Sequence, residues 1–376
     1  MKIVFLGRYN TTDFLTGPEI VAKCVYRELY KYNLEISFIE YFFDGSKYPV
    51  SKKLFGIEKT IDGNVTILRM GLLPIFFYLI RSKPDVIHCI TFERFQVLAF
   101  IYQIFSKSKI IYNVNGIIAY ENSRLRNNLG TFYKWKDSLV EKIIFKHADI
   151  LLFLSRRSME IAGNYYKINK VKSIIVPNGF DPGILKLIHS IEYLSEKLSI
   201  VFVGDSDRPE KGLDFLITSL QESNIPVKLS VLGDKDYLAK INNNLEIEYK
   251  MKMSNQNFIK FLSDKLVFVS ASFYEQFSIS SLEALAMGLV VVLTENTGLS
   301  ELLTDGKDAF IFKYGDKLQL IDIIQKIYDD RKLIDKIKTV SRRKAESLTW
   351  TNITKNYYLP LYKNICVSNE NIDTYK

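Results

Sequence analysis

The feature that most constrains the fold is an alternation, along most of the chain, of short apolar runs with longer amphipathic stretches. Several runs are apolar at consecutive positions, which is typical of parallel strands covered on both faces. Alternating strands and helices predict an α/β fold with a parallel sheet between layers of helices. The expected strands lie at residues 2–7, 35–42, 64–70, 85–90, 109–114, 149–155, 173–179, 198–204, 227–233, 245–250, 266–271, 289–294 and 308–313.

The series of strands and helices breaks between Pro182 and Glu196 and then starts again. Since 376 residues are also too many for one ordinary core, we expect two doubly wound, Rossmann-like domains, 1–182 and 183–349. Ligands of such sheets bind at the carboxyl ends of the strands, where helix N-termini point. Two such edges can face each other across a cleft, so the loops that follow strands are the places to look for chemistry.

The charge balance leaves two interpretations open. An excess of 51 Lys and Arg over 42 Asp and Glu gives a net charge of +9. The charges are either spread over solvated faces or gathered for an anionic partner such as nucleic acid, a phosphate ligand or a lipid surface. The three cysteines, Cys24, Cys89 and Cys366, form no C-x-x-C pair and fit a reducing cytosol. The apolar run Gly71–Ile80 is too short to span a membrane.

The loop after the first strand runs into a helix at Gly17 and Pro18. This is ordinary chemistry for a helix start, and Gly17 would equally let a phosphate approach the backbone. The chain contains neither G-x-G-x-x-G at this loop nor G-x-x-x-x-G-K-[ST] anywhere. These absences count against dehydrogenases and P-loop NTPases.

A second loop, between the strand ending at Gly204 and a helix near Gly212, carries Arg208 and Lys211. Arginine can hold a phosphate with two parallel donors, and lysine supplies a compact charge. The alternative is that both side chains are simply solvated, as most basic residues are.

The stretch from Tyr274 to Leu293 contains two acids, Glu275 and Glu283, on either side of a predicted helix start. The backbone N–H groups of Phe277, Ser278 and Ile279 would favour a diphosphate. Glu275 would then accept hydrogen bonds from a sugar, and Glu283 from the two hydroxyls of a ribose. A nucleotide sugar has this layout. The alternative for Glu283 is a capping box with Ser280.

These motifs resemble those of the GT-B glycosyltransferases, specifically the retaining group called family 4, over nearly the whole chain. The features that match are two Glu separated by seven residues (Glu275 and Glu283), a Phe in the loop between them (Phe277) and Lys-Gly before a helix (Lys211 and Gly212). The others are P-N-G-x-D at 177–181, P-D-V-I-H at 84–88 and a late Trp, Trp350. The resemblance implies two Rossmann-like domains, with the helix of 350–376 crossing back to the first. It also implies a UDP- or GDP-linked sugar donor, retained anomeric configuration, and no metal or other cofactor.

The chain departs from the family pattern at several positions. Gln276 and Ser278 stand where the family has glycine on either side of the loop Phe. Ser206 holds the usual place of the phosphate-binding Arg, so Arg208 would reach the site from a different loop shape. Asn115 stands where a His faces the transferred sugar, and it would hydrogen-bond that sugar without titrating.

The resemblance assigns roles to these residues. Arg208 and Lys211 would oppose the charge of the leaving diphosphate, and Glu275 would position the donor sugar and support positive charge at its anomeric carbon. His88 and His147 are expected to be structural.

The acceptor, a glycan or a lipid-linked glycan, should bind the first domain. Residues 123–148 combine aromatic side chains with Arg124, Arg126, Lys134, Lys136, Lys142 and Lys146. Such a helix either lies on an anionic membrane or is solvated with its apolar side on the sheet. The first alternative predicts a cytoplasmic protein at the inner face of the cell membrane.

Two other functions compete with sugar transfer. The altered glycines and Asn115 suggest a non-catalytic nucleotide-sugar-binding subunit of a glycan assembly complex, although both glutamates and Lys211 are retained. Nucleic-acid binding is suggested only by charge and aromatic residues, and no recognised module supports it.

Overall fold

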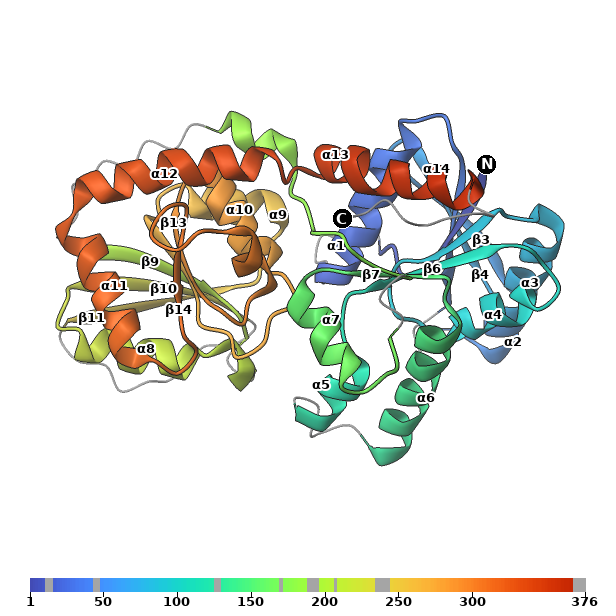
Figure 1. The fold of residues 1–376 in the computed structure, drawn as a ribbon, viewed down its shortest axis with the longest axis horizontal. Coiled ribbons are helices and arrows are strands. Elements are labelled where there is room, and N and C mark those ends of the chain that lie inside the picture. Colours follow the sequence, from blue (N-terminus) through green and yellow to red (C-terminus); the bar gives the residue numbers. More distant parts are fainter. Residues whose placement is uncertain are drawn as a thin grey trace. The chain divides into compact units, whose positions relative to one another are not determined.

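The computed structural model describes residues 1–10, 16–42, 48–124, 130–168, 172–187, 196–205, 208–233 and 244–367 (Figure 1). It consists of two compact units: Met1–Val176 with Trp350–Lys376, and Pro177–Thr349. The boundary therefore precedes residue 182, where we expected it. The N–H of Phe180 donates to the carbonyl of Leu348 at 3.2 Å, and Phe180 forms a bridge with Thr349, so this segment is part of the second unit.

The described part of the first unit forms an eight-stranded sheet in the order β3-β4-β2-β1-β5-β6-β7-β8. The strands pair in parallel except for β3, which runs antiparallel to β4. Their bounds are β1 Lys2–Leu6, β2 Glu35–Tyr41, β3 Ile57–Asp62, β4 Val65–Met70, β5 Val86–Cys89, β6 Lys109–Val114, β7 Ile150–Phe153 and β8 Ser173–Ile175.

Strand β3 was not expected from the sequence. It alternates exposed and half-buried residues, with Ile57, Lys59 and Ile61 on the exposed side. Three charged residues among its six, Glu58, Lys59 and Asp62, hide its strand character, and a strand at the edge of a sheet needs to bury only one face. Each of the other described strands lies within a run that the apolar pattern predicted, except that β11 extends one residue further, to Met251.

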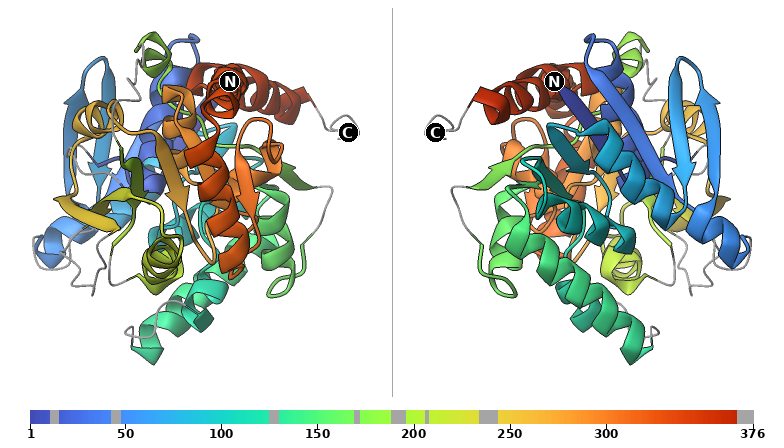
Figure 2. Two further views of the ribbon diagram at one scale, coloured as in Figure 1. Left: turned by 90° about the vertical axis from the view of Figure 1, so that its left-hand side faces the viewer. Right: turned by 90° about the vertical axis from the view of Figure 1, so that its right-hand side faces the viewer.

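Helices cover both faces of the first sheet (Figure 2). The core between them is built from apolar residues of β1, β5, β6 and β7 and of the covering helices. The helices are α1 Gly17–Tyr30, α2 Val50–Phe55, α3 Leu72–Ser82, α4 Val97–Gln103, α5 Ile118–Arg124, α6 Thr131–His147, α7 Arg156–Gly163, α13 Trp350–Ile353 and α14 Leu359–Val367, the last two joined by the π-helical turn Thr354–Tyr358.

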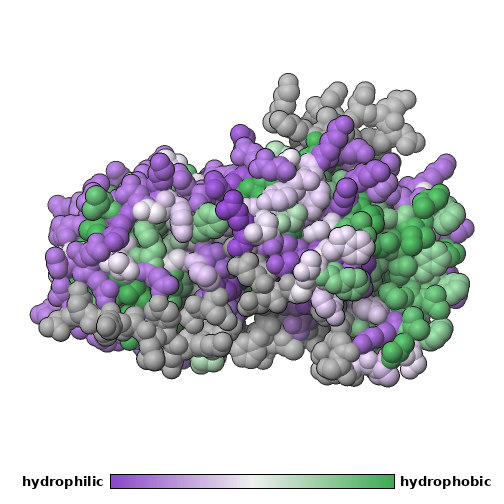
Figure 3. All heavy atoms as spheres, turned by 90° about the horizontal axis from the view of Figure 1, so that it is seen from below, coloured by the Kyte–Doolittle hydropathy of each residue, from purple (hydrophilic) through white to green (hydrophobic). Residues whose placement is uncertain are grey.

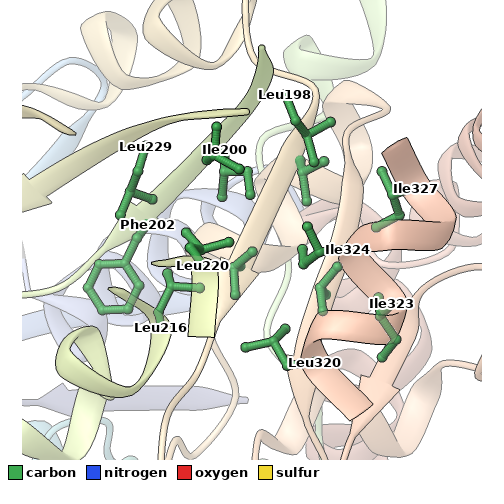
Figure 4. Packing of buried hydrophobic residues seen from close by; sticks show 14 of the residues in the cluster. Leu198, Ile200, Phe202, Leu216, Leu220, Leu229, Leu320, Ile323, Ile324 and Ile327 are labelled. Carbon is green, nitrogen blue, oxygen red and sulfur yellow. The ribbon is translucent and has the colours of Figure 1, made fainter. Parts of the chain in front are cut away.

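The second unit contains, in its described residues, a six-stranded sheet in the order β11-β10-β9-β12-β13-β14, with every pairing parallel. Figure 4 shows Ile200 and Phe202 of β9 among side chains of α8 and α11, which form one core with the sheet. The strands are β9 Leu198–Val203, β10 Val227–Gly233, β11 Leu245–Met251, β12 Val267–Ser270, β13 Val290–Thr294 and β14 Phe310–Phe312.

The helices of the second unit are α8 Leu213–Glu222, α9 Asn255–Leu262, α10 Ile279–Met287, α11 Lys317–Asp329 and α12 Arg331–Glu346. Helices α11 and α12 follow each other almost directly in the chain. They separate at Asp330, whose extended backbone ends the first and whose carboxylate accepts a hydrogen bond from the N–H of Leu333 at 3.0 Å to begin the second.

Among the described helices, none has both the length and the apolar character that a bilayer-crossing segment requires.

Candidate functional site

The point where the strand order of the second sheet reverses lies between β9 and β12, because the chain proceeds from β9 toward β11 on one side and from β12 toward β14 on the other. Ligands of doubly wound sheets bind at the carboxyl ends of the strands at such a point. The loop after β9 carries Arg208 and Lys211, and the loop after β12 carries Glu275. The fold thus brings the three predicted catalytic residues to one place.

The loop that carries Lys211 is fixed by its backbone. A 3-10 turn, Pro209–Lys211, leads into Gly212, which has φ +77°. A Cβ atom at this position would overlap the carbonyl oxygen of Ala271. The N–H of Phe273 also donates to the carbonyl of Glu210 at 2.7 Å, so the two loops are joined directly. Glycine after the lysine is therefore required by the close contact of the loops.

Lys211 and Glu275 form an ion pair between Nζ and Oε2. Both side chains are mostly buried, with 18% and 22% exposed. Burial opposes the ionisation of Glu275, but the charge of Lys211 and its hydrogen bond outweigh it. The charge of Arg208 and the N–H of Phe277 act in the same direction, so the pKa of Glu275 lies below its ordinary value. Glu275 is a carboxylate held in its ionised form.

The guanidinium of Arg208 is half-exposed and pairs with Glu210, with 2.6 Å between Nε and Oε1. Its charge contributes to lowering the pKa of Glu275, so it lies within electrostatic range of that carboxylate. Ser206, which takes the usual place of the family arginine, lies outside the described residues.

Helix α10 begins after Ser278, which has φ +75°, a left-handed conformation that glycine adopts at less cost. The Ser278 side chain accepts a hydrogen bond from the N–H of Ser281 at 3.3 Å and caps the helix. The Phe277 N–H, one of the three amides expected to face a diphosphate, is hydrogen-bonded to the Glu275 carboxylate. The amides of Ser278 and Ile279 lie at the start of the nine-residue helix α10.

Because Ser278 caps α10, the structure does not support the alternative of a capping box between Ser280 and Glu283. Glu283 instead accepts a hydrogen bond from Nδ2 of Asn255, at the start of α9, at 3.2 Å. Its side chain is 6% exposed, and burial raises its pKa to about 7, with a further increase from the charge of Asp181. Glu283 is thus free of any capping role.

The segment that carries Glu275 is held like a short strand. Glu275 forms a parallel bridge with Thr297, and the N–H of Gly298 donates to the carbonyl of Glu275 at 2.9 Å. Next to it, Nε2 of Gln276 donates to the Tyr274 hydroxyl at 2.5 Å. These contacts fix the backbone on both sides of the glutamate.

The first sheet reverses its strand order between β1 and β5, and an arginine stands at this point. The Arg8 guanidinium lies 3.0 Å from a carboxylate oxygen of Glu93 and 3.8 Å from one of Glu19. Burial raises the pKa of Glu93 to about 7, although the charge of Arg8 opposes this shift. Sequence analysis missed this pair. The sequence feature that could have indicated a site here is that each residue closely follows a predicted strand.

Gly17 and Asn115, the other predicted donor-binding residues, lie in the first unit. Gly17 is the first residue of α1, and a Cβ built on it would have no neighbour within 4 Å. Packing against other protein atoms therefore does not require glycine at this position. Nδ2 of Asn115 donates to the carbonyl of Ile90 at 2.7 Å. Its Oδ1 is buried and accepts no hydrogen bond from the described part of the chain.

His88 is structural. It is fully buried in β5, with Nδ1 2.6 Å from the hydroxyl of Tyr362 and Nε2 2.8 Å from Oδ1 of Asn113. Burial lowers its pKa to about 4, which keeps the ring neutral. The histidine therefore links β5 to the returning helix α14.

Helix α6 occupies most of the predicted membrane-docking segment 123–148, in which Arg126 lies outside the described residues. Phe132, Tyr133 and Trp135 are more than half exposed near its start, and Nζ of Lys136 lies 4.2 Å from the centre of the Phe132 ring. Ile144 and Phe145 are buried. The helix is thus anchored at one end and presents aromatic and basic side chains at the other.

No group of three or more His, Cys, Asp and Glu side chains suited to holding a metal ion occurs among the described residues.

Parts of this sequence are similar to those of known glycosyltransferases. Residues 187–344 match the family model of the glycosyl transferases group 1. An uncharacterised 41.2 kDa protein in the cps region of Klebsiella pneumoniae is 24% identical over 302 residues, 73% of this chain and 79% of that protein. The capsular polysaccharide biosynthesis glycosyltransferase CapM of Staphylococcus aureus is 28% identical over 181 residues, 44% of this chain and 47% of CapM.

Solved structures agree on the fold. Sucrose-phosphate synthase from Thermosynechococcus elongatus superimposes with a TM-score of 0.75 at 14% identity, covering 98% of this chain and 100% of the other. HepE from Anabaena, in complex with UDP-glucose, gives a TM-score of 0.67 at 15% identity, with 96% and 100% covered. The fold is that of the GT-B proteins, with two Rossmann-like domains. In sequence, residues 187–344 are thus similar to the glycosyl transferases group 1.

Proposed function

We propose that this protein is a retaining glycosyltransferase of family 4. It moves a sugar from a nucleotide-diphosphate sugar to a glycan or lipid-linked acceptor, in the synthesis of cell-surface polysaccharide or glycolipid. The observation that carries the proposal is the Lys211–Glu275 ion pair at the point of the second sheet where ligands bind. The match to the group 1 glycosyl transferases and the likeness to CapM support it.

In the proposed reaction the bond between the anomeric carbon and the diphosphate oxygen breaks, and a bond from the acceptor oxygen to the same face of that carbon forms. Negative charge develops on the diphosphate, and Lys211, Arg208 and the N-terminal amides of α10 oppose it. The acceptor's proton passes to the departing phosphate oxygen. These roles require no metal ion or other cofactor.

Glu275 is suited to the sugar end of the donor. Its lowered pKa keeps it negative, so it can accept hydrogen bonds from sugar hydroxyls and stabilise positive charge at the anomeric carbon. Lys211 contacts Glu275 directly, so one cation would serve both the carboxylate and the diphosphate. We assign the ribose hydroxyls to Glu283 and a contact with the transferred sugar to Asn115.

We propose a UDP- or GDP-linked donor, and the complex of HepE with UDP-glucose supports the first of these. The acceptor is assigned to the first unit, where Arg8 and Glu93 offer polar groups at the ends of β1 and β5. We also assign helix α6 an electrostatic contact with an anionic membrane, at the inner face of the cell membrane, through its exposed lysines.

One observation favours a second candidate, a nucleotide-sugar-binding subunit without catalysis. Ser278 adopts a left-handed conformation, where a β-carbon limits how closely a phosphate can approach α10. Such a protein would bind the donor as the enzyme does but would release no nucleotide.

A thermal-shift screen of nucleotide sugars tests the proposal, because a ligand that binds only the folded protein raises its melting temperature. A hit is then incubated with candidate glycolipids, the freed nucleotide is quantified, and the anomeric configuration of the product is read by NMR. Release of nucleotide with retained configuration supports the enzyme. A melting shift without nucleotide release supports the binding subunit, and absence of any shift contradicts both.

A further inference from the structure

The first unit carries a large exposed apolar surface that the proposed transfer reaction does not use. It is formed by α2, β3, α3 and α4, three helices in lateral contact and the edge strand of the sheet. Figure 3 shows apolar side chains gathered at the right-hand end of that view, over this part of the unit. The side chains that define this apolar surface are each more than 60% exposed: Val50, Phe55, Ile61, Phe77, Ile104 and Phe105.

The grouping of these exposed residues is unusual. Isolated exposed apolar residues are common, but a contiguous set on neighbouring elements marks an interaction site. Phe105, at 77% exposed, and Ile104 lie just past the end of α4, and Phe77 lies in the middle of α3. The surface therefore extends across several elements and does not depend on one loop.

A groove of about 400 Å³ opens on the same surface. Its lining includes Ile57 of β3, Met70 at the end of β4, and Leu73 and Phe77 of α3. The one charged side chain in the lining is Arg81, near the end of α3. An apolar groove with a single cation matches an amphiphile that has a hydrocarbon chain and an anionic head group.

Exposed positive charges lie on or beside the elements that form the apolar surface. Lys59, Arg81, Lys83 and Lys107 are exposed on or beside its elements. None of the four forms an ion pair with a carboxylate in the described part of the chain. The nearby acid Glu58 is paired with Lys52. These cations are available to an anionic partner.

We propose that this apolar surface docks on an anionic phospholipid bilayer, with the phenylalanines and isoleucines in the interfacial layer and the four cations at the lipid phosphates. A twofold dimer through the same surface would bring these like charges together, which opposes self-association. The groove with Arg81 favours a lipid over a protein partner. This membrane contact differs from the one assigned to α6, which is electrostatic, and it does not depend on the identity of the sugar acceptor.

Co-sedimentation of the full chain with vesicles tests the proposal. Vesicles of phosphatidylglycerol and phosphatidylcholine are compared with phosphatidylcholine alone, at low salt and at ~1 M salt, where a Debye length of about 3 Å suppresses contacts made by charge only. The double variant Phe77→Ser with Phe105→Ser is compared with the wild type, and Phe132→Ser with Trp135→Ser on α6 is the matched control. Both pairs are exposed, so the fold should be kept, and circular dichroism verifies it.

The wild type should bind the anionic vesicles and keep much of this binding at high salt. The Phe77/Phe105 variant should lose at least ~10-fold in partition coefficient at high salt, because each exposed aromatic ring contributes strongly to interfacial binding. The α6 variant should keep its high-salt binding. A variant Arg81→Ala with Lys83→Ala should lose preference for anionic over neutral vesicles.

Three outcomes would overturn the inference: no binding of the wild type to anionic vesicles, unchanged high-salt binding of the Phe77/Phe105 variant, or a change from dimer to monomer in that variant by light scattering. The last would identify a contact between copies of the chain. Vesicle binding is measured without nucleotide sugar, so its failure is distinct from failure of the proposed transfer reaction.

Discussion

Lys211 and Glu275, 64 residues apart in the sequence, form an ion pair that joins the loop after β9 to the loop after β12. Because the two side chains are mostly buried, each depends on the other for a charged partner. The pair lies where the strand order of the second sheet reverses, which is where a doubly wound sheet binds its ligand. Removing the side chain of either residue should therefore change the chemistry of the site more than the stability of the fold.

The substitution Lys211→Ala should lower turnover at least ~100-fold, because it removes a cation placed to oppose charge on the leaving group. It should also raise the pKa of Glu275, since burial would then act with less opposition. Initial rates with the donor found by thermal shift measure the first effect. Lys228→Ala is the matched control, because Lys228 pairs with Glu246 and Glu248 on β11. Normal turnover of Lys211→Ala would contradict the assigned role.

The substitution Glu275→Ala should abolish measurable turnover and leave the fold intact, since the backbone around this residue is held by Thr297 and Gly298 and not by its side chain. Far-UV circular dichroism and the melting temperature verify the fold. If this variant transfers sugar at the wild-type rate, Glu275 does not support the reacting sugar.

The substitution Gly212→Ala should destabilise the second unit by several kcal/mol, roughly 3, because it combines a left-handed backbone with overlap of the Ala271 carbonyl. Gly288→Ala, at φ +85° with no neighbour within 4 Å, should cost only about 1 kcal/mol, since it adds backbone strain alone. Urea unfolding of both variants measures the difference. An equal loss of unfolding free energy in the two variants would show that the contact between Gly212 and Ala271 is not tight.

The substitution Glu283→Gln should stabilise the protein by roughly 2 kcal/mol above pH 7 and leave it unchanged below pH 4.5. The pKa of Glu283 is about 7 in the folded protein and 4.5 as its ordinary value, so ionisation opposes folding as the pH rises through this interval. Urea unfolding at a series of pH values measures the effect. The same variant should bind the donor more weakly at pH 8, because an amide accepts hydrogen bonds from ribose hydroxyls less strongly. A stability difference that does not vary with pH would contradict the shift.

The substitution Ser278→Gly should be nearly neutral or slightly stabilising. It relieves a left-handed conformation worth about 1 kcal/mol, and replacing a serine cap by glycine costs only a few tenths of a kcal/mol. Ser278→Ala keeps the strain and loses the cap, so it should cost about 1 kcal/mol. Thermal unfolding distinguishes the two, and a more stable alanine variant would show that the cap contributes little.

The predicted strands and the two-domain organisation followed from pattern, because buried parallel strands must be apolar at consecutive positions. The pattern failed at β3, where Ile57, Lys59 and Ile61 share one exposed side and the strand buries little. The pattern also placed the domain boundary after residue 182, whereas the second unit begins at Pro177. The hydrogen bond from Phe180 to Leu348 that holds this segment in the second unit joins positions far apart in the chain, which a local pattern does not show.

The candidate site was predicted in part. The residue types and spacing of Lys211, Glu275 and Glu283 indicated a diphosphate site with acids beside it. Sequence analysis could not choose between partners for these acids. It offered a capping box for Glu283, whereas the structure gives Asn255 of a different helix. It did not find Arg8 and Glu93, since a salt bridge between two strand ends has no local pattern.

The amino-acid sequence by itself determined the class of fold and the loops that carry chemistry, because both depend on local periodicity and on which residues follow each strand. Only the tertiary structure decided which charges meet. It buried Glu275 beside a lysine that keeps it ionised, and it buried Glu283 with only an amide donor, which raises its pKa. A carboxylate's ionisation depends on solvent exclusion and on neighbouring charges, and both are set by segments far apart in the chain.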